Sequence, residues 1–213
     1  MRTLGLKVKS MSLFPIFLKL EGRRCLVVGA GKVGEPKIQS LLAAHAEVSV
    51  VAPKGTATVQ RWAESGTVTW NRRGFEASDL DGMVLVIAAT ATETVNEAVF
   101  VEAQRRGILC NSVDDPQHCD FFYPAVVRRG DFQVAISTAG HSPALAQRLR
   151  AELEEQFGPE YAEWVNELGR VRQELFAADM NPEERKRRLH ELASREAFET
   201  AQLSERIYAR TEA

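Results

Sequence analysis

The feature that most constrains this chain is a glycine-rich turn between an apolar run and a helical pattern. Residues 25–28 read Cys-Leu-Val-Val, glycines follow at Gly29, Gly31 and Gly34, and the helical pattern starts at about Lys32. The glycine spacing is G-x-G-x-x-G, and it stands between a strand and a helix, as dinucleotide binding requires. The turn therefore predicts a dinucleotide site near the start of the chain, with a purely structural turn as the alternative.

Each glycine has its own task in a turn of this kind. Gly29 permits the tight bend, Gly31 lets a pyrophosphate approach the backbone, and Gly34 allows helix and strand to pack closely. The helix that follows presents free N–H groups and a partial positive charge to the phosphates. Pro36 falls in the first turn of this helix, where the missing N–H of proline costs nothing.

Strand-like and helix-like segments alternate through the first half of the chain. Strand patterns occur at 25–28, 48–52, 68–70, 83–89 and 108–110, and helical patterns occur at 34–45, 56–65 and 92–106. Gly107 ends the last of these helices, as a C′ glycine commonly does. Such alternation favours a parallel sheet with helices on both faces. The predicted fold class is α/β with an N-terminal Rossmann domain, and the apolar residues 13–20 lead into its first strand.

The character of the sequence changes after Asn111. Residues 111–131 are rich in turn formers and aromatic residues, 132–137 read as a strand, and a polar glycine turn, STAGHSP, follows. Helical patterns then occupy 142–156, 159–178 and 182–210, the last starting at Asn181-Pro182. A small mixed segment and a C-terminal helical domain are therefore expected to follow the Rossmann domain.

Composition and charge exclude several classes of function. The net charge of −2 provides no basic surface for nucleic acid. No apolar run approaches the roughly 18 residues of a membrane span, and the basic first residues lack the apolar core of a secretion signal. The sequence has three cysteines, Cys25, Cys110 and Cys119; their odd number argues against a disulfide framework, and their spacing is not that of metal ligands. His118 and Cys119 lack the second pair of ligands that a zinc site needs. We expect a cytoplasmic protein without a bound metal and without nucleic-acid or membrane partners.

The cofactor type is less constrained than the presence of a dinucleotide. The fingerprint predicts an acidic ribose ligand about 20 residues further on, yet residues 52–55 read Ala-Pro-Lys-Gly. Backbone groups near Pro53 and Lys54 can hold the ribose, or Lys54 can accept a 2′-phosphate and favour NADP. A third interpretation is that Lys54 is simply an exposed loop lysine.

Polar residues follow the ends of two neighbouring strands. The strongest strand runs into Thr90, and the next one into Asn111, with Val113 and Asp114 just beyond. Ligands of doubly wound sheets bind outside the carboxyl ends of the strands. Thr90, Asn111 and Val113 are therefore candidate cofactor contacts, and Asp114 is a candidate base. The alternative is that Asp114-Asp115-Pro116 is only a turn, since Asp and Pro favour turns.

Five collinear segments of the sequence resemble the precorrin-2 dehydrogenases, a family that includes the N-terminal half of siroheme synthase and a bifunctional dehydrogenase–ferrochelatase. The segments cover roughly residues 12–155, and the last two are specific, because a generic Rossmann protein has no reason to carry both. They are FPIFLKL (14–20), LVVGAGKVGEPK (26–37), VIAATATETVN (86–96), CNSVDDP (110–116) and AISTAGHSPALAQRLR (135–150).

The resemblance implies an activity, a cofactor and an assembly. The family oxidises precorrin-2 to sirohydrochlorin with NAD+, and its catalytic aspartate matches Asp114. Its nucleotide contacts match Lys32 and Val33 in the glycine turn and Pro53 and Lys54 after the second strand. The family is homodimeric, with a middle segment that pairs the two copies. The resemblance therefore implies a Rossmann domain at 1–113, a dimerisation segment at 114–155 and a C-terminal helical domain at 156–213.

The resemblance also implies how the substrate binds. Precorrin-2 carries eight carboxylates, so cationic and hydroxyl side chains are expected to line its cleft. The candidates are Arg128, Thr138, His141 and Ser142, although Arg128 can be an ordinary surface arginine, Thr138 can merely satisfy the backbone, and His141 can be an isolated surface histidine. Two other functions stay open: a bifunctional dehydrogenase and ferrochelatase, and a non-catalytic dimeric NAD-sensing module.

Overall fold

The computed structural model describes residues 12–200 and divides the chain into two compact units. The first, the sheet unit, is Phe14–Tyr123; the second, the helical unit, comprises, among the described residues, 124–200 together with 12 and 13. The sequence placed a domain boundary after Val113, whereas the sheet unit continues through Tyr123. The expected last helix extends beyond residue 200, so its end lies outside the described residues.

The sheet unit is built on a five-stranded parallel sheet. The strands are β1 (Arg24–Ala30), β2 (Glu47–Gly55), β3 (Thr69–Asn71), β4 (Leu85–Ala88) and β5 (Leu109–Ser112). Their order is β3-β2-β1-β4-β5, and every neighbouring pair is parallel. The order turns back at β1, which is the switch point of a doubly wound fold. The predicted α/β class is confirmed.

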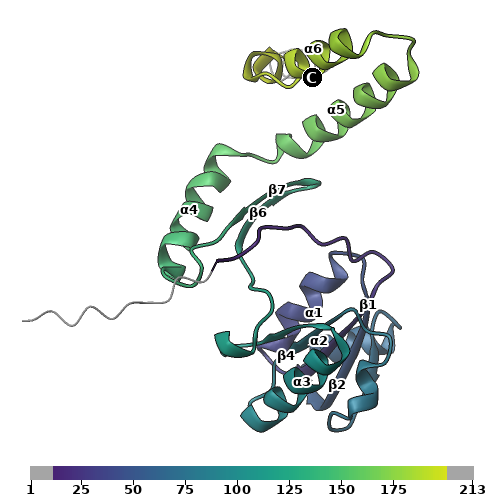
Figure 1. Cartoon of the computed structure of the whole chain (residues 1–213), viewed down its shortest axis with the longest axis vertical. Helices are drawn as coiled ribbons and strands as arrows, with labels where there is room; N and C mark the ends of the chain where they lie inside the picture. Colours follow the sequence, from purple (N-terminus) through teal and green to yellow (C-terminus); the bar gives the residue numbers. More distant parts are fainter. Residues whose placement is uncertain (1–11, 201–213) are drawn as a thin grey trace, which may run out of the picture. The chain divides into compact units, whose positions relative to one another are not determined.

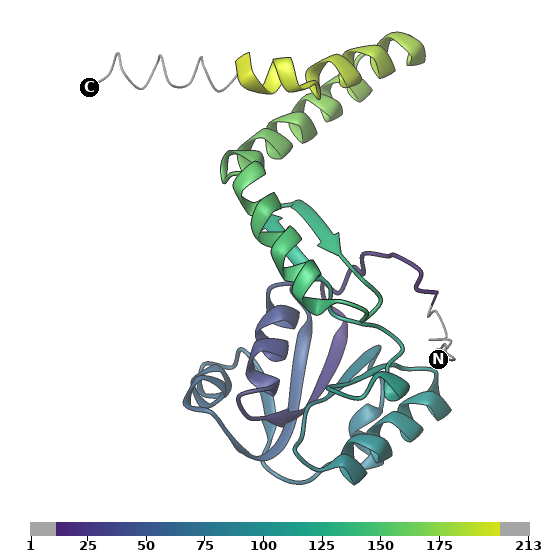
Figure 2. The ribbon, with the colours of Figure 1, turned by 90° about the vertical axis from the view of Figure 1, so that its left-hand side faces the viewer.

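Helices cover both faces of this sheet, α1 on one side and α3 on the other (Figure 2). They are α1 (Gly34–Leu42), α2 (Ala57–Glu64) and α3 (Glu93–Arg106), with short 3₁₀ turns η1 (Ala77–Leu80) and η2 (Pro116–His118). Alternate residues of β1 point to opposite faces: Val27 packs with Ile38 of α1, whereas Leu26 packs in the cluster that contains Val99 of α3. Because both faces are buried, the strand is apolar without interruption.

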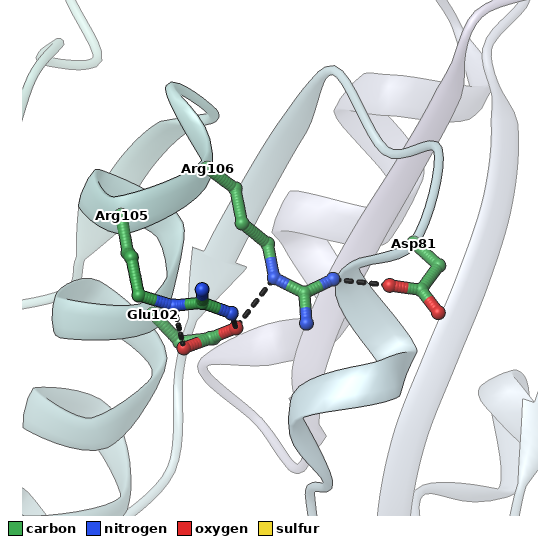
Figure 3. A network of polar contacts seen from close by, with 4 residues as sticks. All are labelled: Asp81, Glu102, Arg105 and Arg106. Carbon is green, nitrogen blue, oxygen red and sulfur yellow. Dashed lines mark hydrogen bonds and ion pairs between the residues drawn. The ribbon is translucent and has the colours of Figure 1, made fainter.

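The C-terminal end of α3 is fixed by its cap and by a network of charges (Figure 3). Gly107 closes the helix in the left-handed conformation at φ 68°, as predicted. Glu102 accepts hydrogen bonds from Arg105 and from Arg106, and Arg106 also pairs with Asp81 in the loop before β4. The two guanidinium groups lower the pKa of Glu102 to about 2.

The glycine turn after β1 depends on two close backbone approaches. Gly29 has a φ of 110°, and a Cβ atom there would overlap the carbonyl oxygen of Ala89. A Cβ atom on Gly34 would overlap the carbonyl oxygen of Gly29. In both cases the obstructing atom belongs to the backbone, so a side chain could fit only if the main chain moved. The packing role that the sequence assigned to Gly34 thus has a steric cause.

Replacing Gly34 by alanine is expected to lower the free energy of unfolding of the sheet unit by about 1–3 kcal/mol, the usual cost of overpacking. Gly31→Ala is the matched control, because a Cβ atom on Gly31 meets no heavy atom within 4 Å. Urea unfolding followed by circular dichroism measures both variants. Equal stability of the two would show that Gly34 is not needed for the close approach.

The helical unit begins with an antiparallel hairpin of β6 (Ala125–Arg129) and β7 (Phe132–Ile136) (Figure 1). The sequence predicted only the second strand, because β6 lies within the turn-rich stretch that reads as a loop. The helices α4 (Pro143–Gln156) and α5 (Glu160–Ala177) occur where they were predicted. The expected single helix over 182–210 is wrong, because α6 (Pro182–Leu192) already ends at Leu192. A new helical turn follows, and the side chain of Ser194 accepts a hydrogen bond from Ala197 N at its start.

The helical unit has little apolar interior. Val127 and Ala146 are the buried hydrophobic residues among its described positions, and neither α5 nor α6 contains a buried residue. Arg129 holds the hairpin to the end of α4 by donating to the carbonyl oxygens of Phe157 (2.9 Å) and Glu154 (3.1 Å). A cluster of tilted and edge-to-face rings supplements this core: Phe132, Phe157, Tyr161, Trp164 and Phe198.

The apolar segment before β1 is largely exposed, although Leu20 at its end packs against the core. Phe14, Ile16 and Phe17 are 85%, 57% and 69% exposed, and the segment has no regular secondary structure. Within residues 12–200, no helix has both the length and the apolar character that a membrane span requires.

Candidate functional site

The glycine turn has room for a ligand above Gly31. This residue is exposed, and no heavy atom lies within 4 Å of the position that its Cβ would occupy. Helix α1 begins at Gly34, and the side chain of its N-cap residue, Val33, makes no capping hydrogen bond. Glu35 N donates to the Gly31 carbonyl oxygen (2.9 Å), and Pro36 has no N–H. A helix N-terminus beside an open glycine suits a pyrophosphate. The turn therefore fits a dinucleotide, with Lys32 and Val33 exposed on the same turn.

A bulge in β2 brings the other predicted nucleotide contacts to the same edge of the sheet. Val28 of β1 pairs with Val51, but Ala30 pairs with Gly55. Three residues of β2, 52–54, therefore lie opposite a single residue of β1, and β2 bulges there. Pro53 and Lys54 lie in this bulge and are exposed. A bulge redirects side chains at the end of a strand, and here it places both residues next to the glycine turn. Their contact with a ribose stays a prediction.

Thr90, after β4, is committed to hydrogen bonds within the protein. Its N–H and its hydroxyl both donate to Asn96 Oδ1 (3.2 and 2.7 Å), and Asn96 Nδ2 donates back to the Thr90 carbonyl oxygen (3.1 Å). Asn96 is 8% exposed. The pair holds the loop that follows β4 in one conformation. The sequence analysis did not identify Asn96, although an asparagine on the buried side of the predicted helix indicates a polar group that needs a partner.

An open cavity of about 400 Å³ lies at the carboxyl end of β5. It combines three predicted site residues with several that the sequence did not single out. Its lining residues are Lys37, Asn111, Ser112, Val113, Asp114, Asp115, Pro116, Cys119, Phe122 and Tyr123. All of them belong to the sheet unit, and β5 and β1 end at the same edge because the sheet is parallel.

Asp114 occupies a strained and exposed position in this cavity. Its φ is 64°, in the left-handed region that few residues other than glycine adopt. Asparagine and aspartate tolerate that region best, so the turn selects an aspartate at a modest cost in backbone energy. Strained backbone of this kind occurs often at functional sites. The left-handed backbone fits the turn alternative as well, so the catalytic role of Asp114 stays a prediction.

The residues around Asp114 are held firmly. Asn111 is 6% exposed and donates from Nδ2 to the Phe121 carbonyl oxygen (2.8 Å) and to Cys119 Sγ (3.3 Å). Val113 N donates to the Ala88 carbonyl oxygen (2.9 Å). The Asp115 carboxylate lies 2.5 Å from His118 Nδ1, and this contact lowers the pKa of Asp115. The amide of Asn111 therefore braces the cavity wall, and the contacts that it and Val113 make with a cofactor stay predictions.

Lys37 and Ser112 are cavity residues that the sequence analysis missed. Lys37 Nζ lies 3.7 Å from the centroid of the Tyr123 ring, and burial lowers the pKa of its ammonium while Asp114 opposes the shift. Ser112 is 1% exposed, and its hydroxyl has no hydrogen-bond partner among the described residues. Lys37 reads as an ordinary helix lysine in sequence, and only the return of the chain at Tyr123 reveals its surroundings.

The four predicted substrate residues all belong to the helical unit. Thr138 Oγ1 accepts a hydrogen bond from Ser142 N (3.1 Å), and Ser142 Oγ accepts one from Leu145 N (3.3 Å) as the N-cap of α4. His141 is exposed in the same turn, and Arg128 is exposed on β6. Three of the four therefore share one turn, in which both hydroxyls already stabilise the backbone. Their roles in binding stay predictions.

Two of the cysteines are buried in the sheet unit. Burial raises the pKa of Cys25 to about 11 and that of Cys110 to about 12, so both are neutral thiols at pH 7. Within the described part of the chain, no three His, Cys, Asp or Glu side chains are grouped so that they could hold a metal ion.

A parallel sheet with an open glycine turn at its switch point defines a dinucleotide-binding protein. Comparison with known families agrees: the family described as "Putative NAD(P)-binding" matches residues 16–125, more than half of the chain. The chain belongs to this NAD(P)-binding family, which confirms the predicted class of cofactor. A second family model, "Sirohaem biosynthesis protein central", matches residues 129–156.

Individual relatives support the resemblance to the siroheme pathway. A siroheme synthase from Nitrosococcus oceani is 44% identical over 144 residues, covering 68% of this chain and 31% of that protein. Siroheme synthase 1 from Aeromonas hydrophila is 39% identical over 167 residues, covering 78% of this chain and 36% of that protein. The chain thus spans about a third of the length of these relatives.

A solved structure resembles the chain over most of its length. The structure titled "SirC, precorrin-2 dehydrogenase" has a TM-score of 0.74 and 26% identity, covering 86% of this chain and 90% of that chain. Together with the relatives above, it confirms the resemblance that the sequence motifs indicated.

Proposed function

We propose that this protein is an NAD-dependent dehydrogenase that oxidises precorrin-2 to sirohydrochlorin. One observation supports this most: Asp114 lines an open cavity at the same edge of the sheet as the open glycine turn. The relatives named siroheme synthase and the structure titled precorrin-2 dehydrogenase indicate the substrate. The geometry supplies a place for a cofactor and a base beside a cavity.

The chain contributes binding, orientation and a proton acceptor. When NAD is bound, it supplies the hydride acceptor. The glycine turn and the N-terminus of α1 would hold its pyrophosphate, and Pro53 and Lys54 would lie beside its ribose. Asp114 takes the proton that the substrate loses together with the hydride, so two electrons and two hydrogens leave the macrocycle. The gain in conjugation provides much of the driving force, and the protein supplies positioning and a base.

We also propose that the protein is a cytoplasmic homodimer. The helical unit has little buried apolar surface of its own, and Leu145 and Phe176 are 47% and 52% exposed. A second copy that covers such residues would provide the burial that the unit lacks. Sedimentation equilibrium tests this proposal: a monomer at micromolar concentration would contradict it.

An absorbance assay tests the proposed activity. Precorrin-2 and NAD+ are incubated with the protein under anaerobic conditions, with and without Fe²⁺. The spectrum of sirohydrochlorin is expected in both samples, and NADH formation at 340 nm should match it in amount. A further iron-dependent change would add ferrochelatase activity. Tight NAD binding without turnover would instead identify a nucleotide-sensing module and overturn the proposal.

A further inference from the structure

We infer that Lys37 is a substrate-binding residue, whose ammonium receives a carboxylate of the substrate inside the cavity that Asp114 lines. The inference rests on the proposed function, because it deepens how that cavity recognises its ligand. It concerns the sheet unit alone, since every residue that lines the cavity lies within Phe14–Tyr123.

Lys37 is the one cation among the residues that line this cavity. It stands on α1, three residues after the close-packed Gly34, so the glycine turn fixes the helix that carries it. Its ammonium lies over the face of Tyr123, 3.7 Å from the ring centroid. The ring restricts where the ammonium can lie and holds the charge at the cavity wall.

The ammonium of Lys37 is only partly compensated in the protein. It has neither a hydrogen bond nor an ion pair within 4.0 Å among residues 12–200, although the Asp114 carboxylate is close enough to oppose the fall of its pKa. Burial has removed part of its hydration, which is the main cause of that lowered pKa. A carboxylate that enters the cavity would restore the lost hydrogen bonds with charge-assisted ones.

A second polar group points to a ligand independently. Ser112 is among the residues that line the same cavity and is 1% exposed, and its buried hydroxyl lacks a hydrogen-bond partner in the described part of the chain. Buried hydroxyls are normally paired, so an unpaired one beside a cavity marks a polar group that a bound water or ligand oxygen would satisfy. Phe122 and Tyr123 add aromatic surface to the same wall. A cation, a free hydroxyl and aromatic rings together suit a flat, conjugated molecule with carboxylate substituents.

The substrate is not the sole anion that could reach Lys37, because the phosphates of the nucleotide are expected near the start of the same helix. A carboxylate of the substrate is favoured because Lys37 faces the Asp114 cavity, whereas the open space for the pyrophosphate lies above Gly31. The experiment therefore measures the affinity for sirohydrochlorin and the affinity for NAD+ separately.

The test compares Lys37→Met with Lys19→Met, a control at an exposed lysine that pairs with Glu21 outside the cavity. Sirohydrochlorin is titrated into each full-length protein and followed by its visible absorbance, and NAD+ affinity is measured by calorimetry. Lys37→Met should bind sirohydrochlorin about 10- to 100-fold more weakly, the usual effect of losing a charge-assisted hydrogen bond. Its NAD+ affinity should stay within about twofold of wild type, and Lys37→Arg should recover part of the loss because it keeps the charge.

A second measurement does not depend on the proposed activity. After reductive ¹³C-methylation, the NMR signal of Lys37, assigned by its loss in Lys37→Met, should titrate below the usual range of a lysine side chain. Asp114→Asn should move it lower still, because the carboxylate opposes the fall of the Lys37 pKa. Burial also raises the pKa of the Tyr123 phenol.

The possible outcomes separate the two proposals. Unchanged sirohydrochlorin affinity in Lys37→Met, in a protein that oxidises precorrin-2, overturns the inference and leaves the proposed function standing. Loss of NAD+ affinity alone overturns it in favour of a phosphate contact. Titration of Lys37 within the usual range of a lysine side chain removes its physical basis. A wild-type protein that neither binds sirohydrochlorin nor oxidises precorrin-2 overturns both proposals.

Discussion

Replacing Asp114 by asparagine is expected to lower kcat for precorrin-2 oxidation about 10²- to 10⁴-fold, the usual contribution of a positioned general base. The amide has nearly the shape of the carboxylate but cannot accept the proton. NAD+ affinity should stay unchanged, because the open glycine turn is formed by other residues. Steady-state kinetics and calorimetry on the same preparation measure the two effects.

Asparagine is the informative replacement because of the backbone at this position. Asp114 has a φ of 64°, which asparagine adopts more easily than alanine. Asp114→Ala would add backbone strain of about 1–2 kcal/mol to the loss of the base, so its defect would be harder to interpret. Asp131→Asn, at an exposed position between β6 and β7, is the control. Wild-type turnover by Asp114→Asn would remove this residue from the mechanism.

Replacing Gly31 by aspartate should weaken NAD+ binding at least about 100-fold. The new carboxylate would occupy the space that the pyrophosphate needs and would repel its charge. The protein itself should tolerate the change, because no heavy atom lies within 4 Å of the position of the new Cβ. Calorimetry with NAD+ and a urea unfolding curve distinguish lost binding from lost folding.

Gly74→Asp provides a matched control for this experiment. Gly74 also has open space around the position of its Cβ and lies in the exposed loop between β3 and η1. The control should bind NAD+ as the wild type does. If Gly31→Asp also retained wild-type affinity, no pyrophosphate would lie over Gly31, and the proposed nucleotide site would be wrong.

Local sequence patterns predicted most of the sheet unit because their causes are local. The uninterrupted apolar run of β1 follows from burial on two faces, and the left-handed cap at Gly107 follows from the absence of a side chain. The strand that was missed, β6, is a partly exposed strand in a stretch rich in turn formers. The break after α6 escaped prediction because Ser194 reads as one more polar helix residue, and its capping role needs the backbone of Ala197.

The candidate site was predictable only in part. Asp114 follows a strand end, and strand ends of a parallel sheet meet at one edge, so its neighbourhood could be expected from sequence. Thr90 and Asn111 were expected to contact the cofactor, but their side chains are engaged in hydrogen bonds that hold adjacent loops. Such partners lie 6 and 10 residues away along the chain, at separations that no helix or strand period encodes.

The sequence by itself determined the α/β fold, the glycine turn and the position of the candidate base, because strand periodicity, glycine spacing and strand-end position depend on near neighbours. Only the tertiary structure decided that Lys37, Ser112 and Tyr123 line one cavity with Asp114. These residues come from a helix, a strand end and a returning segment. Their burial and charge interactions exist only after the chain has folded back on itself, so no local pattern could reveal them.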